Sequence, residues 1–327
     1  MALRDYLVEE VALDCEDGLV SRREALRRLG LLGVSGAAAA ALLAACGDDD
    51  GAASTTAVVT TPTTPASTSA ASTSAASTIV ASTQAGSGQA TSPPSSASPS
   101  GSGEEIRFTG PNGELIGVLA EADSPQGAVL VIHENRGLTP HIRSIPARLA
   151  ADGYTALAID LLSAEGGTAS LPSEGDATAA LGNAPTERLL ADVRAGLDEL
   201  GRRAPGAKLA AIGFCFGGGM TWQLLAAGEP RLAAAVPFYG PFPDGADLSG
   251  SPDAAVLGIY AGQDGRVNGT MEAAEQALAA AGLTHELRTF EGVDHAFFND
   301  TGARYDAEAA TQAYQAMIDW FGQHLRS

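Results

Sequence analysis

The sequence predicts an α/β protein built on a doubly wound, mostly parallel sheet with helices on both faces. From residue 104 onward, short apolar runs alternate with longer amphipathic patterns, and strands separated by helices favour a parallel sheet. The run Ala128–Ile132 is apolar throughout, which is typical of a strand buried on both faces. Polar residues with catalytic chemistry follow several of these runs directly, where open parallel sheets bind ligands.

The expected elements follow one another in a regular order. A hairpin turns at Asn112-Gly113, a dipeptide typical of tight turns. A helix begins at Thr139-Pro140, because proline is favoured at the first helical position. Residues 163–185 are interrupted by Gly and Pro and could cap the site. The other expected elements are strands at 106–109, 115–121, 128–132, 154–159, 209–212, 232–238, 254–260 and 285–290, and helices at 186–203 and 307–324.

Composition divides the chain into three parts, 1–46, 47–103 and 104–327. Residues 47–103 are almost entirely Ser, Thr, Ala, Gly and Pro, with too little apolar bulk to offset the entropy of ordering, so we expect a disordered linker. The last part, with more than two hundred residues, is long enough to bury a core of its own.

Residues 1–46 have the features of an export signal. The segment 21–27 resembles a twin-arginine motif, and the apolar stretch 29–45 is too short for a convincing membrane span. It closes on Leu43-Ala44-Ala45-Cys46, which resembles a bacterial lipoprotein cleavage box with Cys46 as the lipidated residue. The alternative is an uncleaved membrane anchor. Both predict an extracytoplasmic protein attached to the membrane through its N-terminus.

The charge and the cysteines exclude several classes of function. The net charge of −20 argues against nucleic acid and anionic membrane surfaces as partners, since both require basic patches. No Cys/His cluster has metal-ligand spacing, and Gly217-Gly218-Gly219 lacks the spacing of a dinucleotide fingerprint. We therefore expect no metal, no cofactor and no nucleic acid, and a monomer that acts on a small molecule.

The most informative motif is Gly213-Phe214-Cys215-Phe216-Gly217, directly after the apolar run 209–212. It is the G-x-S-x-G nucleophile elbow with a thiol in place of the hydroxyl. Small residues on both sides let the backbone turn sharply from strand to helix, and the next backbone N–H points to where an oxyanion forms. Because Cys15 and Cys46 fall in the leader, we expect Cys215 to be the only thiol of the folded part.

A base and an orienting acid should follow the nucleophile in that order. His295 lies in the turn after the strand at 285–290, and loops after strands commonly display catalytic side chains. Asp264 lies in the tight loop after the strand at 254–260. We therefore expect His295 as base and Asp264 as acid. The alternatives are His285 and His324 for the base, and Asp244, Asp247, Asp253 and Asp294 for the acid.

These segments resemble the dienelactone hydrolase family, which has the α/β-hydrolase fold. The matching stretches are 131–137, 213–218, 261–264 and 291–297. The resemblance implies that Cys215 is the nucleophile, His295 the base, Asp264 its orienter, and Glu134 a helper in forming the thiolate. It also implies an oxyanion hole formed by the N–H groups of Phe216 and Asn135. We expect His133 to be a packed residue at the strand end.

The substrate carries over less well than the reaction. Family members that cleave dienelactone hold its carboxylate with two arginines, where this chain has the segment 161–164 and Asn299. A neutral ester, lactone or thioester is therefore plausible. Tyr239, Phe242 and Phe298 follow strand ends and are expected to line an apolar acyl pocket.

The function expected from these residues is hydrolysis of a small ester or lactone through an acyl-enzyme on Cys215. Three alternatives remain open: a thioesterase, a surface-displayed binding lipoprotein that kept the fold and lost the chemistry, and a thiol redox protein. The last would lack a resolving cysteine.

Overall fold

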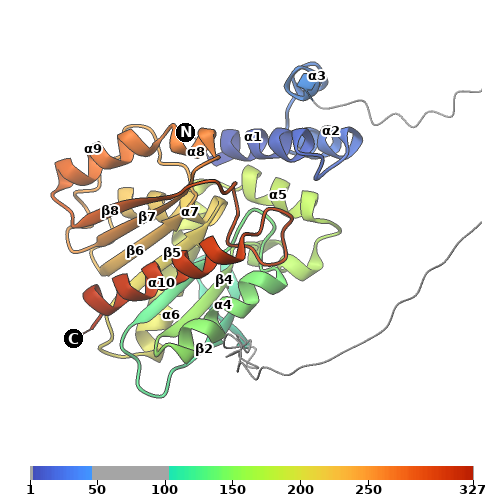
Figure 1. The fold of residues 1–327 in the computed structure, drawn as a ribbon. Helices are drawn as coiled ribbons and strands as arrows, with labels where there is room; N and C mark the ends of the chain where they lie inside the picture. Colours follow the sequence, from blue (N-terminus) through green and yellow to red (C-terminus); the bar gives the residue numbers. More distant parts are fainter. Residues whose placement is uncertain (1–2, 46–102, 327) are drawn as a thin grey trace, which may run out of the picture. The chain divides into compact units, whose positions relative to one another are not determined.

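A computed structural model describes residues 3–45 and 103–326 of the chain. A sheet of eight strands forms its centre (Figure 1). The strands are β1 (Glu104–Gly110), β2 (Gly113–Ala120), β3 (Ala128–Ile132), β4 (Thr155–Asp160), β5 (Leu209–Phe214), β6 (Leu232–Phe238), β7 (Ala255–Ala261) and β8 (His285–Phe290).

The strand order is β1-β2-β4-β3-β5-β6-β7-β8. Only the pairs β1–β2 and β2–β4 are antiparallel, and the five pairs from β4–β3 to β7–β8 are parallel. The opening hairpin turns between Gly110 and Gly113, as Asn112-Gly113 predicted. The carboxyl ends of β3, β5, β7 and β8 therefore meet at one edge of the sheet.

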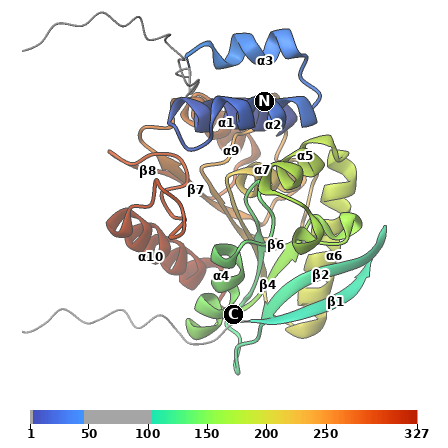
Figure 2. The ribbon, with the colours of Figure 1, turned by 90° about the vertical axis from the view of Figure 1, so that its right-hand side faces the viewer.

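Helices cover both faces of this sheet (Figure 2). Helices α4 (Pro140–Ala151) and α10 (Ala307–His324) lie on one face, and α6 (Thr186–Arg203) and α7 (Phe216–Ala226) lie on the other. The strands β3, β4, β5 and β7 are buried along their whole length, as expected for a sheet covered on both sides. The predicted doubly wound architecture is confirmed.

Shorter helices fill the connections. The segment 163–185, expected as an irregular cap, contains two 3₁₀ turns, η2 (Ser163–Glu165) and η3 (Thr168–Ser170), and then a regular helix, α5 (Glu174–Asn183). The hydroxyl of Ser173 caps α5 by accepting from the N–H of Asp176. The connection between β7 and β8 holds α8 (Gly265–Asn268) and α9 (Met271–Ala281).

The N-terminal residues fold together with the sheet. They form α1 (Leu3–Glu16), α2 (Arg22–Leu31), α3 (Gly36–Leu42) and η1 (Leu43–Ala45). Helix α1 packs against α5 and α7, and α2 packs against α5. The leader was expected to be separate from the folded part, but both belong to one compact unit. The apolar core explains the difference, since Leu7, Leu29 and Leu32 are fully buried.

Two expectations about the leader change accordingly. Cys15 is buried in α1, so Cys215 is not the only thiol of the folded part. Among the helices of residues 3–45 and 103–326, none combines the length and apolar character needed to cross a bilayer. Cys46 and the linker up to residue 102 lie outside the described residues.

Candidate active site

Cys215 lies at the sharp turn between β5 and α7, with backbone angles φ 57° and ψ −116°. Few non-glycine residues adopt a positive φ, so surrounding contacts must hold this turn. The flanking glycines make the turn possible. A Cβ at Gly213 would lie 1.9 Å from the carbonyl oxygen of Gly217, and one at Gly217 would lie 2.3 Å from that of Ile132. The glycine positions of the elbow are therefore required by close backbone approach.

His295 and Asp264 meet at the carboxyl ends of β8 and β7. The His295 Nδ1–H donates to Asp264 Oδ2 at 2.5 Å, and Asp264 Oδ1 accepts from the N–H of Val267 at the start of α8. The remaining imidazole nitrogen, Nε2, points toward the elbow. Ligand atoms of Cys215, His295 and Glu10 all lie within 4.8 Å of one another. The structure thus brings the expected residues Cys215, His295 and Asp264 together, with Glu10 beside them.

The other candidates for base and acid have different partners. His285 lies 3.1 Å from Glu275, and His324 packs against Trp320 with ring centroids 4.5 Å apart. Asp294 accepts from the backbone N–H of the residue that follows it. We find no contact between these side chains and the thiol within the described residues.

Glu134 follows β3 and is buried beside the elbow. Its Oε2 accepts from Asn299 Nδ2 at 2.6 Å, while Oε1 has no hydrogen-bond partner within the described part of the chain. Burial raises the pKa of the Glu134 carboxyl. The neighbouring His133 is fully buried, accepts from the N–H of Leu161 and donates to the carbonyl of Glu134. His133 is thus a packed residue at the strand end, as expected.

The two residues expected to form the oxyanion hole come from the elbow and from the loop after β3. Phe216 is the first residue of α7, directly after Cys215. Asn135 lies in the loop after β3, where its carbonyl accepts from Thr178 of α5, and it lines the same cavity as Cys215. Both positions therefore border the thiol.

One contact to the thiol comes from α1, which the sequence did not indicate. Tyr6 Oη lies 3.1 Å from Cys215 Sγ and 3.2 Å from His295 Nε2, and Glu10 Oε1 lies 3.7 Å from the same nitrogen. Tyr6 and Glu10 are buried. Their partners lie more than two hundred residues away in the sequence, so no local pattern in the leader could have revealed these contacts.

The charges around this cluster shift the pKa of both reacting groups. Burial raises the pKa of the Cys215 thiol, and the carboxylate of Glu10 raises it further. Burial alone lowers the pKa of His295, but the carboxylates of Glu10 and Asp264 outweigh that effect and raise it well above its ordinary value. Both shifts favour the neutral thiol over the thiolate and the protonated imidazole over the neutral ring.

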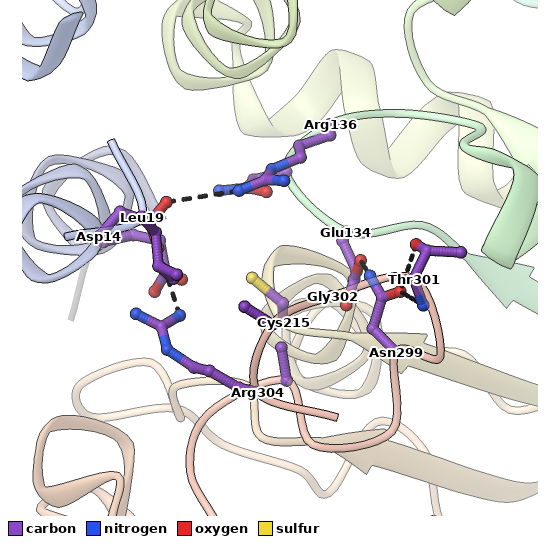
Figure 3. A pocket seen from close by; sticks show the side chains of 13 residues that line it. Asp14, Leu19, Glu134, Arg136, Cys215, Asn299, Thr301, Gly302 and Arg304 are labelled. Atoms are coloured by element: carbon purple, nitrogen blue, oxygen red, sulfur yellow. Dashed lines mark hydrogen bonds and ion pairs between the residues drawn. The ribbon is translucent and has the colours of Figure 1, made fainter. Parts of the chain in front are cut away.

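A cavity of about 220 Å³ opens beside Cys215 (Figure 3). Asp14 bridges two guanidinium groups there, 3.5 Å from Arg136 and 3.2 Å from Arg304. The lining comes from α1 and its following loop, the loop after β3, the elbow and the loop after His295. The residues are Glu10, Asp14, Leu19, Glu134, Asn135, Arg136, Cys215, Ala296, Asn299, Thr301, Gly302, Ala303 and Arg304.

The aromatic residues expected to form an acyl pocket are absent from this lining. They are packed in the core instead. Phe242 meets Trp222 edge-on at 5.1 Å, and Phe298 stacks on Phe214 at 5.2 Å. The ring of Tyr239 packs against that of His295, with the two centroids 5.0 Å apart. These rings thus support the elbow and the imidazole, and the cavity is lined by charged, polar and small apolar residues instead.

The cavity also changes the expectation about substrate charge. Asn299 takes the position at which the resemblance puts an arginine of the family, and its side-chain amide donates to Glu134. Arginines nevertheless reach the cavity from two other positions, Arg136 and Arg304. The absence of arginine at the two family positions therefore does not make the site neutral.

One group of potential metal ligands coincides with this site. Within the part of the chain that the structure describes, Glu10, Cys215 and His295 form a cluster of buried ligand atoms close enough to hold an ion. The Tyr6 hydroxyl already contacts two of the three.

Comparison with known proteins identifies the family. Residues 115–325 match the dienelactone hydrolase family. The chain belongs to this family. An Escherichia coli K12 protein described as "Putative carboxymethylenebutenolidase" is 34% identical over 218 residues, covering 62% of this chain and 79% of the relative. The family and these relatives support a hydrolase.

Solved structures support the same fold. A "Putative Dienelactone Hydrolase" from Klebsiella pneumoniae is 30% identical with a TM-score of 0.60, covering 68% of this chain and 98% of that one. A dienelactone hydrolase-like promiscuous phosphotriesterase from metagenomic libraries is 27% identical with a TM-score of 0.60, again over 68% of this chain and 98% of that one. The sheet is therefore that of an α/β hydrolase.

Proposed function

We propose that this protein hydrolyses a small ester or lactone through an acyl-enzyme on Cys215. The observation that carries the proposal is the convergence at one sheet edge of the elbow thiol and the His295 imidazole, with Asp264 2.5 Å behind it. Geometry of this kind suits a nucleophile, a base and an orienting acid.

Acylation begins with transfer of the thiol proton to His295 Nε2. The thiolate sulfur bonds to the carbonyl carbon, and the oxyanion accepts hydrogen bonds from the N–H groups of Phe216 and Asn135. The carbon–oxygen bond to the leaving group then breaks, and His295 returns the proton to the departing oxygen. The product is a thioester on Cys215. Asp264 holds the imidazole in position and stabilises its protonated form.

Deacylation uses the same groups in reverse. His295 takes a proton from water, the hydroxide attacks the thioester carbonyl, and the carbon–sulfur bond breaks. The proton on His295 restores the thiol. Glu134 lines the cavity, and its Oε1 has no hydrogen-bond partner among residues 3–45 and 103–326, which supports a hydrogen bond from Glu134 to the thiol or to bound substrate.

The lining of the cavity favours a substrate that carries a carboxylate. Arg136 and Arg304 approach the same carboxylate of Asp14, and a guanidinium pair is well suited to a carboxylate. The test compares p-nitrophenyl hydrogen succinate with neutral p-nitrophenyl acetate. Arg304→Gln should raise the ratio of KM for the anionic ester to KM for the neutral one about tenfold, because a change in the docking of α1 affects both esters alike. Equal effects on both esters would contradict a carboxylate-binding role.

The catalytic assignment is tested by turnover of p-nitrophenyl acetate in the full chain. Cys215→Ala and His295→Ala should each lower turnover by at least roughly 100-fold. His285→Ala is the matched control, because its ring binds Glu275 away from the thiol. If all the variants matched wild type, the hydrolase proposal would be abandoned.

We further propose that the protein is exported and lipidated at Cys46. This rests on the twin-arginine-like segment and the cleavage box of the sequence. Cys46→Ala should leave an uncleaved protein, while wild type should be shortened and labelled by a fatty-acid probe. Fractionation and mass measurement of both proteins decide the point. A wild type that keeps its leader and takes up no label would contradict the proposal.

A further inference from the structure

We infer that α1 is an intramolecular inhibitor, and that the cleft above Cys215 is a docking surface for this acidic helix of the leader. The inference rests on the proposed function, since it concerns the same thiol and imidazole. Four observations carry it: the position of Tyr6, the pairing of charges, the anchoring of the leader on α5, and the size of the remaining cavity.

Tyr6 occupies the space in which the reaction would take place. Its hydroxyl lies within hydrogen-bonding distance of both the nucleophile and the base, 3.1 Å from Cys215 Sγ and 3.2 Å from His295 Nε2. A substrate carbonyl must come within about 3–3.5 Å of the same sulfur to react. A substrate and the Tyr6 side chain therefore cannot occupy the site together.

Charges on α1 and on the cleft are complementary. Glu10, Asp14 and Asp17 are spaced by four and three residues, which places them on one side of the helix and the turn that follows. Each meets an arginine of the enzyme. Glu10 pairs with Arg266, Asp14 with Arg136 and Arg304, and Asp17 with Arg304.

Arg266 recognises the docked helix in three ways. It binds the buried carboxylate of Glu10, its Nη1 donates to the carbonyl of Tyr6 at 3.1 Å, and its guanidinium carbon lies 4.4 Å from the centroid of the Tyr6 ring. Such a fit of backbone, ring and carboxylate to one side chain indicates a specific binding mode.

The rest of the leader is anchored at a distance from the thiol. Leu32 is fully buried at the end of α2, and its Cδ2 reaches the backbone of Gly182 in α5 so closely that a Cβ there would lie 2.4 Å from it. Arg27 pairs with Asp176, and Asn183 donates to the carbonyl of Leu31. These contacts hold α1 over the elbow from outside the catalytic cluster.

The docked helix also limits the space for substrate. The cavity beside Cys215 measures about 220 Å³, whereas small-molecule sites usually measure about 300–1,000 Å³. Glu10, Asp14 and Leu19 form part of its wall. Glu10 also raises the pKa of His295, which keeps the imidazole from accepting a proton. The docked helix thus narrows the site, and its carboxylate favours the protonated imidazole.

Cleavage before Cys46 would cut the chain between α1 and the enzyme. The same leader would then direct export and inhibit the enzyme, and processing would raise the low activity of the full chain. Removal of Asp14 would release one carboxylate partner from both Arg136, which keeps its pair with Glu174, and Arg304.

The test measures alkylation of Cys215 by iodoacetamide in the uncleaved full chain, followed by mass spectrometry of the Cys215 peptide, together with turnover of p-nitrophenyl acetate. Glu10→Lys places a cation against Arg266, and Glu16→Lys makes the same change at an exposed position of α1. Leu32→Asp disrupts the remote anchor, and Leu31→Asp is its exposed neighbour.

Glu10→Lys and Leu32→Asp should each raise the rate of Cys215 alkylation and the rate of ester turnover about ten- to a hundred-fold. This is the effect expected from the loss of one charge-assisted hydrogen bond or of one buried apolar side chain. The two controls should match wild type. Unchanged or slower alkylation in both variants would overturn the inference. Faster alkylation with slower turnover would also overturn it, since α1 would then belong to the catalytic machinery. Faster alkylation without ester turnover in any protein would sink the hydrolase proposal and leave the docking inference standing.

Discussion

Replacing Gly213 by alanine should break the elbow on which the site depends. The added Cβ would lie 1.9 Å from the carbonyl oxygen of Gly217 and 2.6 Å from Thr221 Oγ1. That is about 1.5 Å short of ordinary van der Waals contact, and the first obstacle is backbone, which cannot rotate away. Overpacking by one methylene costs about 1–3 kcal/mol, so we expect a loss of about 3 kcal/mol or more.

The assay is urea unfolding followed by circular dichroism. With a slope of about 1–3 kcal/mol per molar, the midpoint should fall by about 1 M or more at an unchanged slope. Gly201→Ala is the matched control, because Gly201 lies in α6 with nothing within 4 Å of an added Cβ. It should gain about 0.5–1 kcal/mol. A Gly213→Ala midpoint equal to that of Gly201→Ala would refute the account of the elbow.

Two further predictions concern the catalytic groups. Asp264→Asn keeps a side-chain oxygen that can cap α8 but removes the negative charge next to His295 Nδ1. We therefore expect kcat to fall roughly 10²- to 10⁴-fold with KM little changed. An unchanged kcat would contradict the role of Asp264. Because the negative charge of Glu10 raises the pKa of His295, and only the neutral imidazole is a base, Glu10→Gln should move the acid limb of kcat/KM to lower pH. A pH profile from 5 to 9 measures this shift, and a limb that stays in place would show that Glu10 does not control His295.

The sequence predicted the sheet because its signals are local. The apolar runs at 128–132 and 209–212 became β3 and β5, and the Asn112-Gly113 turn joined β1 to β2. The placement of Cys215, Asp264 and His295 also followed from local features, since each lies in the turn or loop that follows a strand, and the parallel topology then brings those strand ends together.

The sequence did not predict the contacts of the leader. Its composition matches an export signal, which predicts no contact between the enzyme and Tyr6 or Glu10. Their partners Cys215, Arg266 and His295 are distant in the chain, and no periodic pattern encodes such pairings. The aromatic pocket was wrong for a related reason. Phe242 and Phe298 follow strand ends, but their large apolar surfaces are buried in the core, where burial is most favourable.

Trapping the acylated sulfur tests the central claim most directly. The Glu10→Lys protein is mixed with p-nitrophenyl acetate, quenched in acid within milliseconds and digested, and the peptide that contains Cys215 is examined by mass spectrometry. The account predicts an acetyl group on Cys215 that appears before steady state and disappears as substrate is exhausted. Turnover with an unmodified Cys215 peptide at every quench time, or with the acetyl group on another side chain, would contradict it.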